Sequence, residues 1–247
     1  MGISLLTGGG GARGSWLLAG VLLVAQTLAC SAGERPTPTS GPPQDLGEIL
    51  QQSASRLLAL DSVAFTLEQQ KGTTTLTTGV EMRKAYGVVE IPDKFTLTVE
   101  AELVSPRIFL EIGVVVIEDQ AYMTDLLSGK WGRVPMASVP VNFSNLGQTL
   151  AGITKAIKAP VLVGSERLGG RETHHIKGTI RSEDLSGLVP GAGQGFSVDL
   201  DIWLDQSENV LVQAVIVGKV VPTDIPDARR LLTLDQFDVP VDITAPE

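Results

Sequence analysis

Apolar and polar residues alternate strictly along residues 95–103. Phe95, Leu97, Val99, Ala101 and Leu103 are apolar, and every position between them is Thr or Glu. A period of two residues is typical of a β-strand with one buried face. The next segment, Ile108–Ile117, is apolar at nearly every position, which predicts a strand that is covered on both faces or borders a dry cavity. The middle of the chain, residues 73–134, is therefore predicted to be a run of antiparallel strands with one apolar face.

Similar patterns recur on both sides of this run. They predict further strands over residues 62–70, 73–86 with a break near 79, 87–91, 121–124, 131–134, 161–168, 172–181, 195–204, 210–221 and 230–237. The Gly-rich interruption at residues 182–194 is predicted to be a surface loop.

Two segments show a helical period instead. Residues 45–60 begin with Asp45 and Glu48 in the spacing of a capping box, and residues 145–158 begin with Asn145 and end before Pro160. Each segment places its apolar residues on one stripe: Leu46, Ile49, Leu50, Leu57 and Leu60 in the first, and Leu146, Leu150, Ile153 and Ile157 in the second. Both helices are predicted to pack on the sheet.

The N-terminal region has the features of a targeting segment. Residues 16–29 are apolar over a length typical of a signal peptide, and Cys30 follows directly, before the small residues 31–33. This arrangement resembles the lipobox of bacterial lipoproteins, in which the chain is cleaved before the cysteine and the cysteine is lipidated, although Thr27 stands where an aliphatic residue is usual. We predict a signal peptide over 1–29, a flexible Pro-, Ser-, Thr- and Gly-rich tether over 30–44 and a single domain over 45–247. The alternatives are an uncleaved anchor or a simple secretion signal.

Charge and composition narrow the class of function. The net charge of −9 and pI near 4.8 argue against a nucleic-acid partner, because such affinity depends on clustered Lys and Arg. Cys30 is the single cysteine, so the chain has neither an internal disulfide nor a Cys-based metal site.

Candidate chemical motifs are weak. His174 and His175 are adjacent in a predicted strand and so point to opposite faces. The carboxylates Asp199, Asp201 and Asp205 lack the Gly and terminal Glu of a calcium loop, and a solvated face is the simpler interpretation. Trp131 is interpreted as a core or edge plug rather than a ligand contact. We therefore expect no catalytic residues, no metal and no cofactor.

Several segments, taken in order, resemble the actinobacterial LppX/LprA/LprF/LprG lipoprotein family. They are the helix at 45–60 leading into Ser62-Val63-Ala64-Phe65, the Gly129-Lys130-Trp131 turn, the Glu172–Gly178 strand, and Val198–Asp205 followed by Leu211 and Val212. The resemblance spans roughly residues 45–243. It implies an α+β fold, in which a strongly curved antiparallel half-barrel has helices over its concave face and encloses a hydrophobic cavity for acyl chains, similar in outline to the Lol-type lipoprotein carriers.

On this basis we expect a non-enzymatic lipoprotein, anchored to the outer face of the cell membrane through acyl chains such as palmitate on Cys30, that carries lipid or glycolipid within the envelope. We expect a monomer, with a membrane transporter as a possible partner. The expected cavity lining is Leu97, Val99, Ile112, Val114, Leu150 and Ile153. The alternative is an envelope interaction or structural lipoprotein with a solid core and no lipid cargo.

Overall fold

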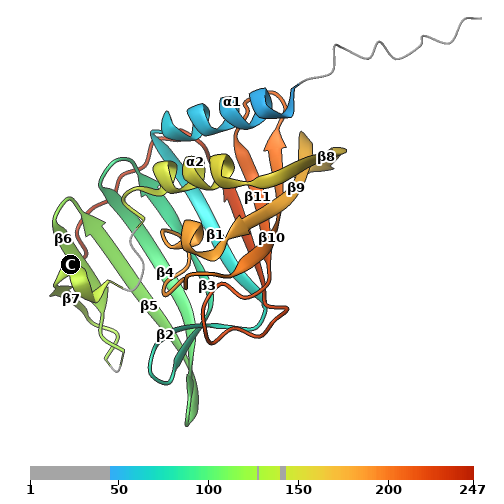
Figure 1. Ribbon diagram of the computed structural model, residues 1–247. Coiled ribbons are helices and arrows are strands. Elements are labelled where there is room, and N and C mark those ends of the chain that lie inside the picture. The colour runs from blue at the N-terminus through green and yellow to red at the C-terminus, as the bar shows by residue number, and fades with distance from the viewer. Residues whose placement is uncertain (1–44, 127, 140–142) are drawn as a thin grey trace, which may run out of the picture. The chain divides into compact units, whose positions relative to one another are not determined.

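The computed structural model describes residues 45–126, 128–139 and 143–247. In these residues a large antiparallel sheet carries two α-helices across one face (Figure 1). The elements are α1 (Leu46–Leu58), β1 (Ser62–Lys71), β2 (Thr74–Thr77), β3 (Val80–Glu90), β4 (Lys94–Val104), β5 (Arg107–Ile117), β6 (Gln120–Thr124), β7 (Trp131–Val134), the 3₁₀ turn η1 (Met136–Ser138), α2 (Leu146–Ala156), β8 (Lys158–Leu168), β9 (Arg171–Arg181), the 3₁₀ turn η2 (Ser182–Leu185), β10 (Ser197–Asp205), β11 (Leu211–Val217) and β12 (Arg229–Asp235).

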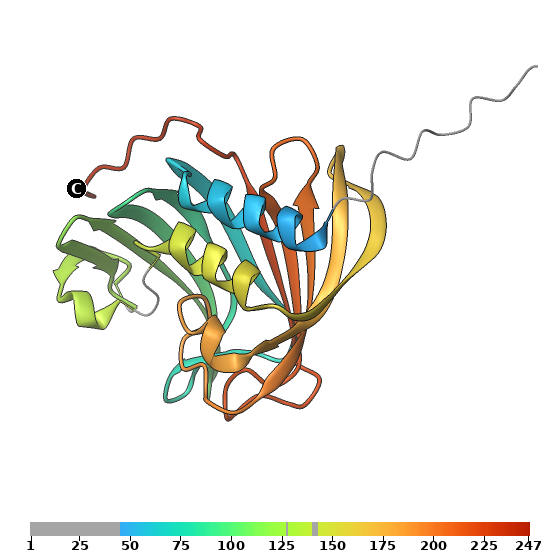
Figure 2. The ribbon, with the colours of Figure 1, turned by 45° about the horizontal axis from the view of Figure 1, so that its top comes forward.

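The sheet is open and strongly curved. Its strand order is β7-β6-β5-β4-β3-β1-β12-β11-β10-β9-β8, with β2 paired to β3, and the chain thus joins two antiparallel runs through the β1–β12 pair. Figure 2 shows both helices lying across the concave face of this half-barrel. The predicted α+β half-barrel is confirmed.

Side-chain alternation explains which residues face the helices. Leu97 pairs with Gly87 on β3 and with Val114 on β5, and Val99 pairs with Ala85 and Ile112. Directly paired residues share a face, so the apolar set continues across neighbouring strands. On this face Phe143, just before α2, packs its ring 4.3 Å from that of Phe65. The concave face is therefore the core face.

The predicted break between residues 86 and 87 is wrong, because β3 runs unbroken from Val80 to Glu90. Gly87 lies within it, where a Cβ atom would stand 1.9 Å from the carbonyl oxygen of Thr96. Gly87 therefore permits a close backbone approach inside the sheet and does not end a strand.

The predicted helices form with small differences at their ends. Asp45 caps α1 by accepting a 2.9 Å hydrogen bond from the Gly47 amide, whereas Glu48 accepts from Gln52 and does not complete a capping box. Asn145 makes no side-chain capping bond, and α2 ends at Ala156, two residues earlier than predicted.

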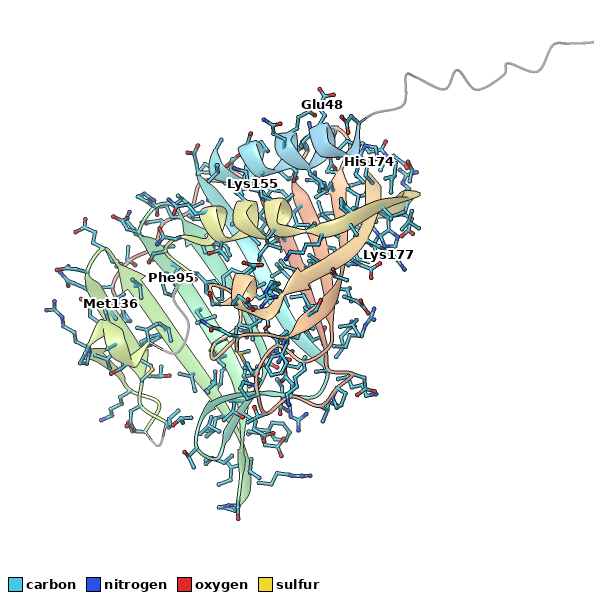
Figure 3. The ribbon with its side chains drawn as sticks, viewed as in Figure 1. Glu48, Phe95, Met136, Lys155, His174 and Lys177 are labelled. Carbon is cyan, nitrogen blue, oxygen red and sulfur yellow. The ribbon has the colours of Figure 1, made fainter. Side chains whose placement is uncertain are left out.

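The two helices cross closely at Gly147. A Cβ atom there would stand 2.6 Å from the Leu57 carbonyl oxygen. The helices turn their charged residues outward, as Glu48 and Lys155 show in Figure 3. In the described residues no helix is both long and apolar enough to cross a membrane.

The segment predicted to be a surface loop, residues 182–194, is in part a plug. Leu185, Leu188 and Val189 are buried in the core. The segment also packs on α2, where Gly187 makes room for Thr149. Its apolar residues close part of the concave face, so the prediction of a surface loop was wrong for them.

The apolar run of β5 is not covered along its whole length. Residues 114–116 are buried as expected, but Ile108 is 45% exposed and Phe109 77% exposed, as is the preceding Val104 at 51%. These three residues belong to the β4–β5 hairpin, which extends beyond the rest of the sheet (Figure 1). We call them the hairpin rim.

Candidate functional site

An apolar pocket of about 370 Å³ opens on the concave face, away from α2. Its lining is mainly aliphatic, with two hydroxyl groups at the margin: Leu76, Thr77, Val80, Ile112, Met123, Leu126, Ala137, Ser138 and Val139. The volume lies in the range of roughly 300–1,000 Å³ that is typical of small-molecule sites. We call this the rim pocket because Ile112, in its floor, is on β5, the strand that also carries Ile108 and Phe109 of the hairpin rim.

Strand geometry places the floor of the rim pocket. Val80 pairs with Leu103, and Met123 pairs with Val114, so both lie on the same face as Ile112. Leu76 comes from β2, and the walls are completed by Leu126 and by the η1 segment that follows β7. The pocket thus combines segments that are distant in the sequence.

The six residues predicted to line a cavity all belong to one buried hydrophobic cluster. Ile112, 6% exposed, also lines the rim pocket. Leu97, Val99, Val114, Leu150 and Ile153 are each at most 2% exposed and pack between sheet and helix. Sequence reasoning missed Leu76, Val80 and Met123, although Val80 and Met123 have the period-2 phase of their strands.

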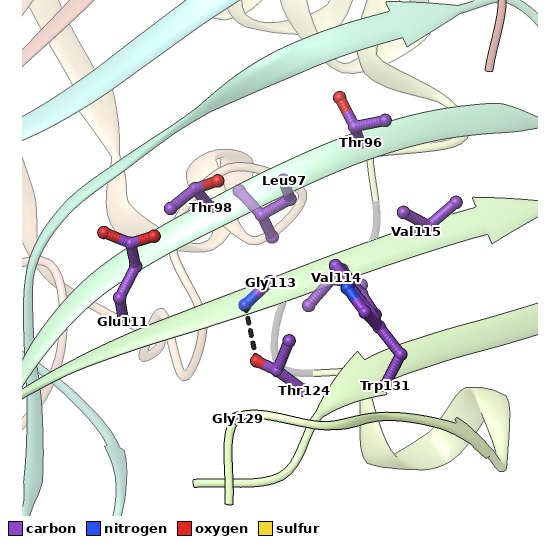
Figure 4. Close-up of a pocket in the computed structure, with 10 residues that line it drawn as sticks. All are labelled: Thr96, Leu97, Thr98, Glu111, Gly113, Val114, Val115, Thr124, Gly129 and Trp131. Atoms are coloured by element: carbon purple, nitrogen blue, oxygen red, sulfur yellow. Dashed lines mark hydrogen bonds between the residues drawn. The ribbon is translucent and has the colours of Figure 1, made fainter. Parts of the chain in front are cut away.

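A second pocket, of about 520 Å³, lies on the opposite face of β4 and β5 (Figure 4). Its lining includes Thr96, Thr98, Thr124, Glu111 and Trp131. The Thr124 hydroxyl accepts a 2.8 Å hydrogen bond from the Gly113 amide. Hydroxyl and carboxylate groups make this surface a poor site for an acyl chain, despite its larger volume. Trp131 is 38% exposed and covers Gly113, which agrees with an edge plug.

A buried polar cluster lies on the concave face where β1 meets β12. Arg230 is 0% exposed and donates to Asp224 at 2.7 Å and to Thr74 at 3.1 Å. Asp224 also accepts from the amides of Val220 and Val221, so its carboxylate is fully bonded. Sequence analysis singled out neither Asp224 nor Arg230. A signal was available, since Arg230 shares the period-2 phase of Leu232 and Leu234.

The two histidines lie on opposite faces, as predicted. Both ring nitrogens of His175 are bonded to carboxylates, Nδ1 to Glu166 at 2.7 Å and Nε2 to Asp201 at 2.6 Å, and the ring stacks on Trp203. With both nitrogens engaged, His175 joins three neighbouring strands and offers no free base. His174 faces the core side, where burial lowers its pKa.

The aspartates after residue 198 are not simply a solvated face. Asp205 is 2% exposed and accepts hydrogen bonds from Ser207 and Glu208, which begin the next turn. Burial raises the pKa of Asp205, but these bonds together with Arg171 lower it below its usual value. Within the described ranges no three His, Cys, Asp or Glu side chains group as a metal site.

The predicted lipidation site, Cys30, lies outside the described residues. The predicted signal peptide and tether lie there too. Cleavage and acylation at this position therefore remain predictions.

Two solved structures share the fold. The crystal structure of LprF from Mycobacterium bovis matches with a TM-score of 0.64 and 18% identity, covering 83% of this chain and 99% of that chain. Lipoprotein LppX from Mycobacterium tuberculosis matches with a TM-score of 0.54 and 19% identity, covering 81% and 98%. A LolA superfamily protein from Nitrosomonas europaea aligns at a TM-score of 0.26 and 10% identity, covering 78% and 93%, which is too distant to support an argument.

No curated protein sequence matches this chain. The family model described as LppX_LprAFG lipoprotein matches residues 45–243, which is most of the chain. The half-barrel, its helical cover and this match lead to one conclusion. The chain belongs to the LppX_LprAFG lipoprotein family.

Proposed function

We propose that this protein is a membrane-anchored, extracytoplasmic lipoprotein that binds acyl chains of lipid or glycolipid and carries them within the cell envelope. The observation that carries the proposal is the aliphatic rim pocket on the concave face. Membership of a lipoprotein family supports the anchor at Cys30 on the outer face of the cell membrane. The activity needs no catalytic group, since binding and release involve no chemical step.

The size of the rim pocket suits one acyl chain. A dry apolar cavity of about 150 Å³ holds the six carbons of benzene, so roughly 25 Å³ serves each carbon. The 370 Å³ of the rim pocket then corresponds to about 15 carbons. Complete burial would gain about 0.8 kcal/mol per methylene relative to water, or on the order of 12 kcal/mol at most for such a chain, because the pocket is open on one side.

Relative to a bilayer the same burial is nearly neutral, because the chain leaves one apolar environment for another. The rate of lipid exchange with a membrane is therefore limited by how readily the acyl chain can enter the pocket, and not by a difference in affinity between pocket and bilayer. The hairpin rim supplies exposed apolar surface near the pocket, with Ile108 on the face of Ile112, and Val104 and Phe109 on the opposite face of the same two strands. Such a patch is typical of a surface that contacts lipid or a partner.

We propose that the predicted lining residues, Leu97, Val99, Ile112, Val114, Leu150 and Ile153, form the inner end of the same site. A longer chain would then enter between α2 and the sheet. Their tight packing favours the alternative function, an envelope interaction protein with a solid core. The two functions differ in whether the folded protein takes up lipid.

The test is a blocking substitution in the rim pocket. Met123→Trp places a large side chain among the pocket residues, whereas Tyr122→Trp, one residue earlier on β6, changes the opposite face. Protein purified from the expression host is extracted with solvent, and any bound lipids are identified by mass spectrometry. The delipidated protein is then titrated with a fluorescent fatty-acid probe.

We expect bound lipid in the wild type and in Tyr122→Trp, and a loss of about tenfold or more in probe affinity for Met123→Trp. A folded wild type that carries no lipid and binds no probe would establish the solid-core alternative. Equal binding by both variants would move the site away from the rim pocket.

A further inference from the structure

Two side chains on the concave face have buried polar atoms without a partner. Arg230 uses only Nη2 in its bonds to Asp224 and Thr74, and its Nε and Nη1 atoms make no hydrogen bond. Gln69 is directly opposite Arg230 in the β1–β12 register, and neither Oε1 nor Nε2 of its amide has a partner. All four atoms are buried.

This arrangement is unfavourable for stability alone. Buried polar groups in proteins are nearly always hydrogen-bonded, and each unpaired donor or acceptor costs about 1–3 kcal/mol. A buried ion pair such as Arg230–Asp224 is itself weak support for a fold. The position would be filled more favourably by an apolar residue, as it is at Leu232 and Leu234 on the same face. The unpaired atoms are therefore suited to a group that the protein binds.

The two side chains are linked to the rim pocket through β2. Gln69 is in phase with Phe65 and Leu67, which face the helices, and Arg230 reaches Thr74 on β2. The β2–β3 register shifts between Thr75 and Thr77, but Thr74 and Thr77 pair with Met82 and Val80, which are two residues apart on β3 and so share a face. Thr77 and Leu76 both line the rim pocket. The polar atoms thus adjoin the apolar site along one strand.

The charge balance defines the chemistry of the bound group. Asp224 already neutralises Arg230, and its second oxygen is bonded to two backbone amides. A phosphate or carboxylate would add a buried negative charge with no further cation to balance it, which is costly. An ester carbonyl or a hydroxyl accepts from Arg230 and Gln69 without adding charge.

We propose that Arg230 and Gln69 form a polar subsite that holds an uncharged, hydrogen-bond-accepting group of the lipid, such as an acyl ester carbonyl. This inference rests on the proposed lipid-binding function and defines its ligand as a neutral acyl ester. One acyl chain would occupy the rim pocket while its ester lies at the β1–β12 boundary.

The experiment compares three lipids and two variants. Delipidated wild type is titrated with a diacylglycerol, with its dialkyl ether analogue, which lacks the carbonyls, and with the matching phosphatidic acid. Gln69→Met removes the amide but leaves the Arg230–Asp224 pair intact. Gln70→Met, at the exposed neighbouring position, removes only a surface bond from Arg229 and is the control.

We expect the wild type and Gln70→Met to prefer the ester over the ether by about tenfold, the effect of one hydrogen bond to a charged donor. Gln69→Met should reduce that preference severalfold and keep its melting temperature, because its amide has no partner to lose. The ester–ether ratio of the wild type tests the subsite without any variant.

Equal binding of ester and ether by the wild type would overturn the subsite while leaving lipid binding intact. Tighter binding of phosphatidic acid than of diacylglycerol would overturn its uncharged character. Binding of none of the three lipids would overturn the subsite and the proposed function together.

Discussion

Replacing Gly147 with alanine is expected to destabilise the helical cover of the concave face. Its Cβ atom would stand 2.6 Å from the Leu57 carbonyl oxygen, which is a backbone atom of α1 and has no freedom to rotate away. Ordinary carbon–oxygen contacts are longer by about 1 Å, so α2 must shift relative to α1. Overpacking of this kind costs roughly 1–3 kcal/mol.

Gly152 provides a matched control on the same helix. A Cβ atom at this exposed position meets nothing within 4 Å. Alanine there should stabilise the protein by up to about 1 kcal/mol, because glycine is the poorer helix former. The two substitutions are chemically identical, so helix propensity cancels between them and the steric conflict remains.

The measurement is thermal unfolding followed by circular dichroism. The two variants should differ by about 1–3 kcal/mol, and at roughly 2–4 °C per kcal/mol for a domain of this size the melting temperatures should differ by about 2–12 °C. Gly147→Ala melts below the wild type and Gly152→Ala at or above it. Equal melting temperatures would refute the close helix crossing as a determinant of stability.

Two further predictions concern the rest of the fold. The Arg181 side chain lowers the pKa of Glu183 to about 2, so the stabilisation from this carboxylate is complete above its usual pKa of 4.5 and is lost as the pH falls toward 2. Between pH 5 and pH 2.5 the melting temperature of Glu183→Gln should therefore fall less than that of the wild type. Parallel curves of melting temperature against pH would contradict this prediction. His175→Phe keeps an aromatic ring but removes the bonds to Glu166 and Asp201, and hydrogen exchange should accelerate in β8 and not in β4. Unchanged exchange in β8 would show that His175 does not hold this edge strand.

Local patterns predicted most of the secondary structure. The apolar positions from Phe95 to Ala101 and the stripe residues Leu146, Leu150 and Ile153 lie in β4 and α2 and are buried there, whereas Leu103 is only partly buried and Ile157 follows the end of α2. The predictions failed where a glycine or a loop is used differently in three dimensions. Gly87 lies within a strand because another backbone approaches it, and Leu188 is buried because its segment folds under α2.

The candidate site was less predictable. The period of the strands identified the apolar face of the sheet and so found Ile112. It did not show which part of that face the helices leave uncovered. The same period marks Gln69 and Arg230 as polar residues at inward positions, yet their adjacency depends on pairing β1 with β12, some 160 positions apart in the chain. Asp224 reaches Arg230 only through the turn of its own loop.

The sequence by itself determined which residues face inward, because side-chain direction follows from the repeat of a strand or helix and needs only near neighbours. The tertiary structure decided which inward residues meet, how closely α1 and α2 approach the sheet, and where apolar surface remains open. Those properties depend on strand order, curvature and long-range packing, and no local period specifies them. The rim pocket and the Gln69–Arg230 subsite are therefore products of the assembled half-barrel.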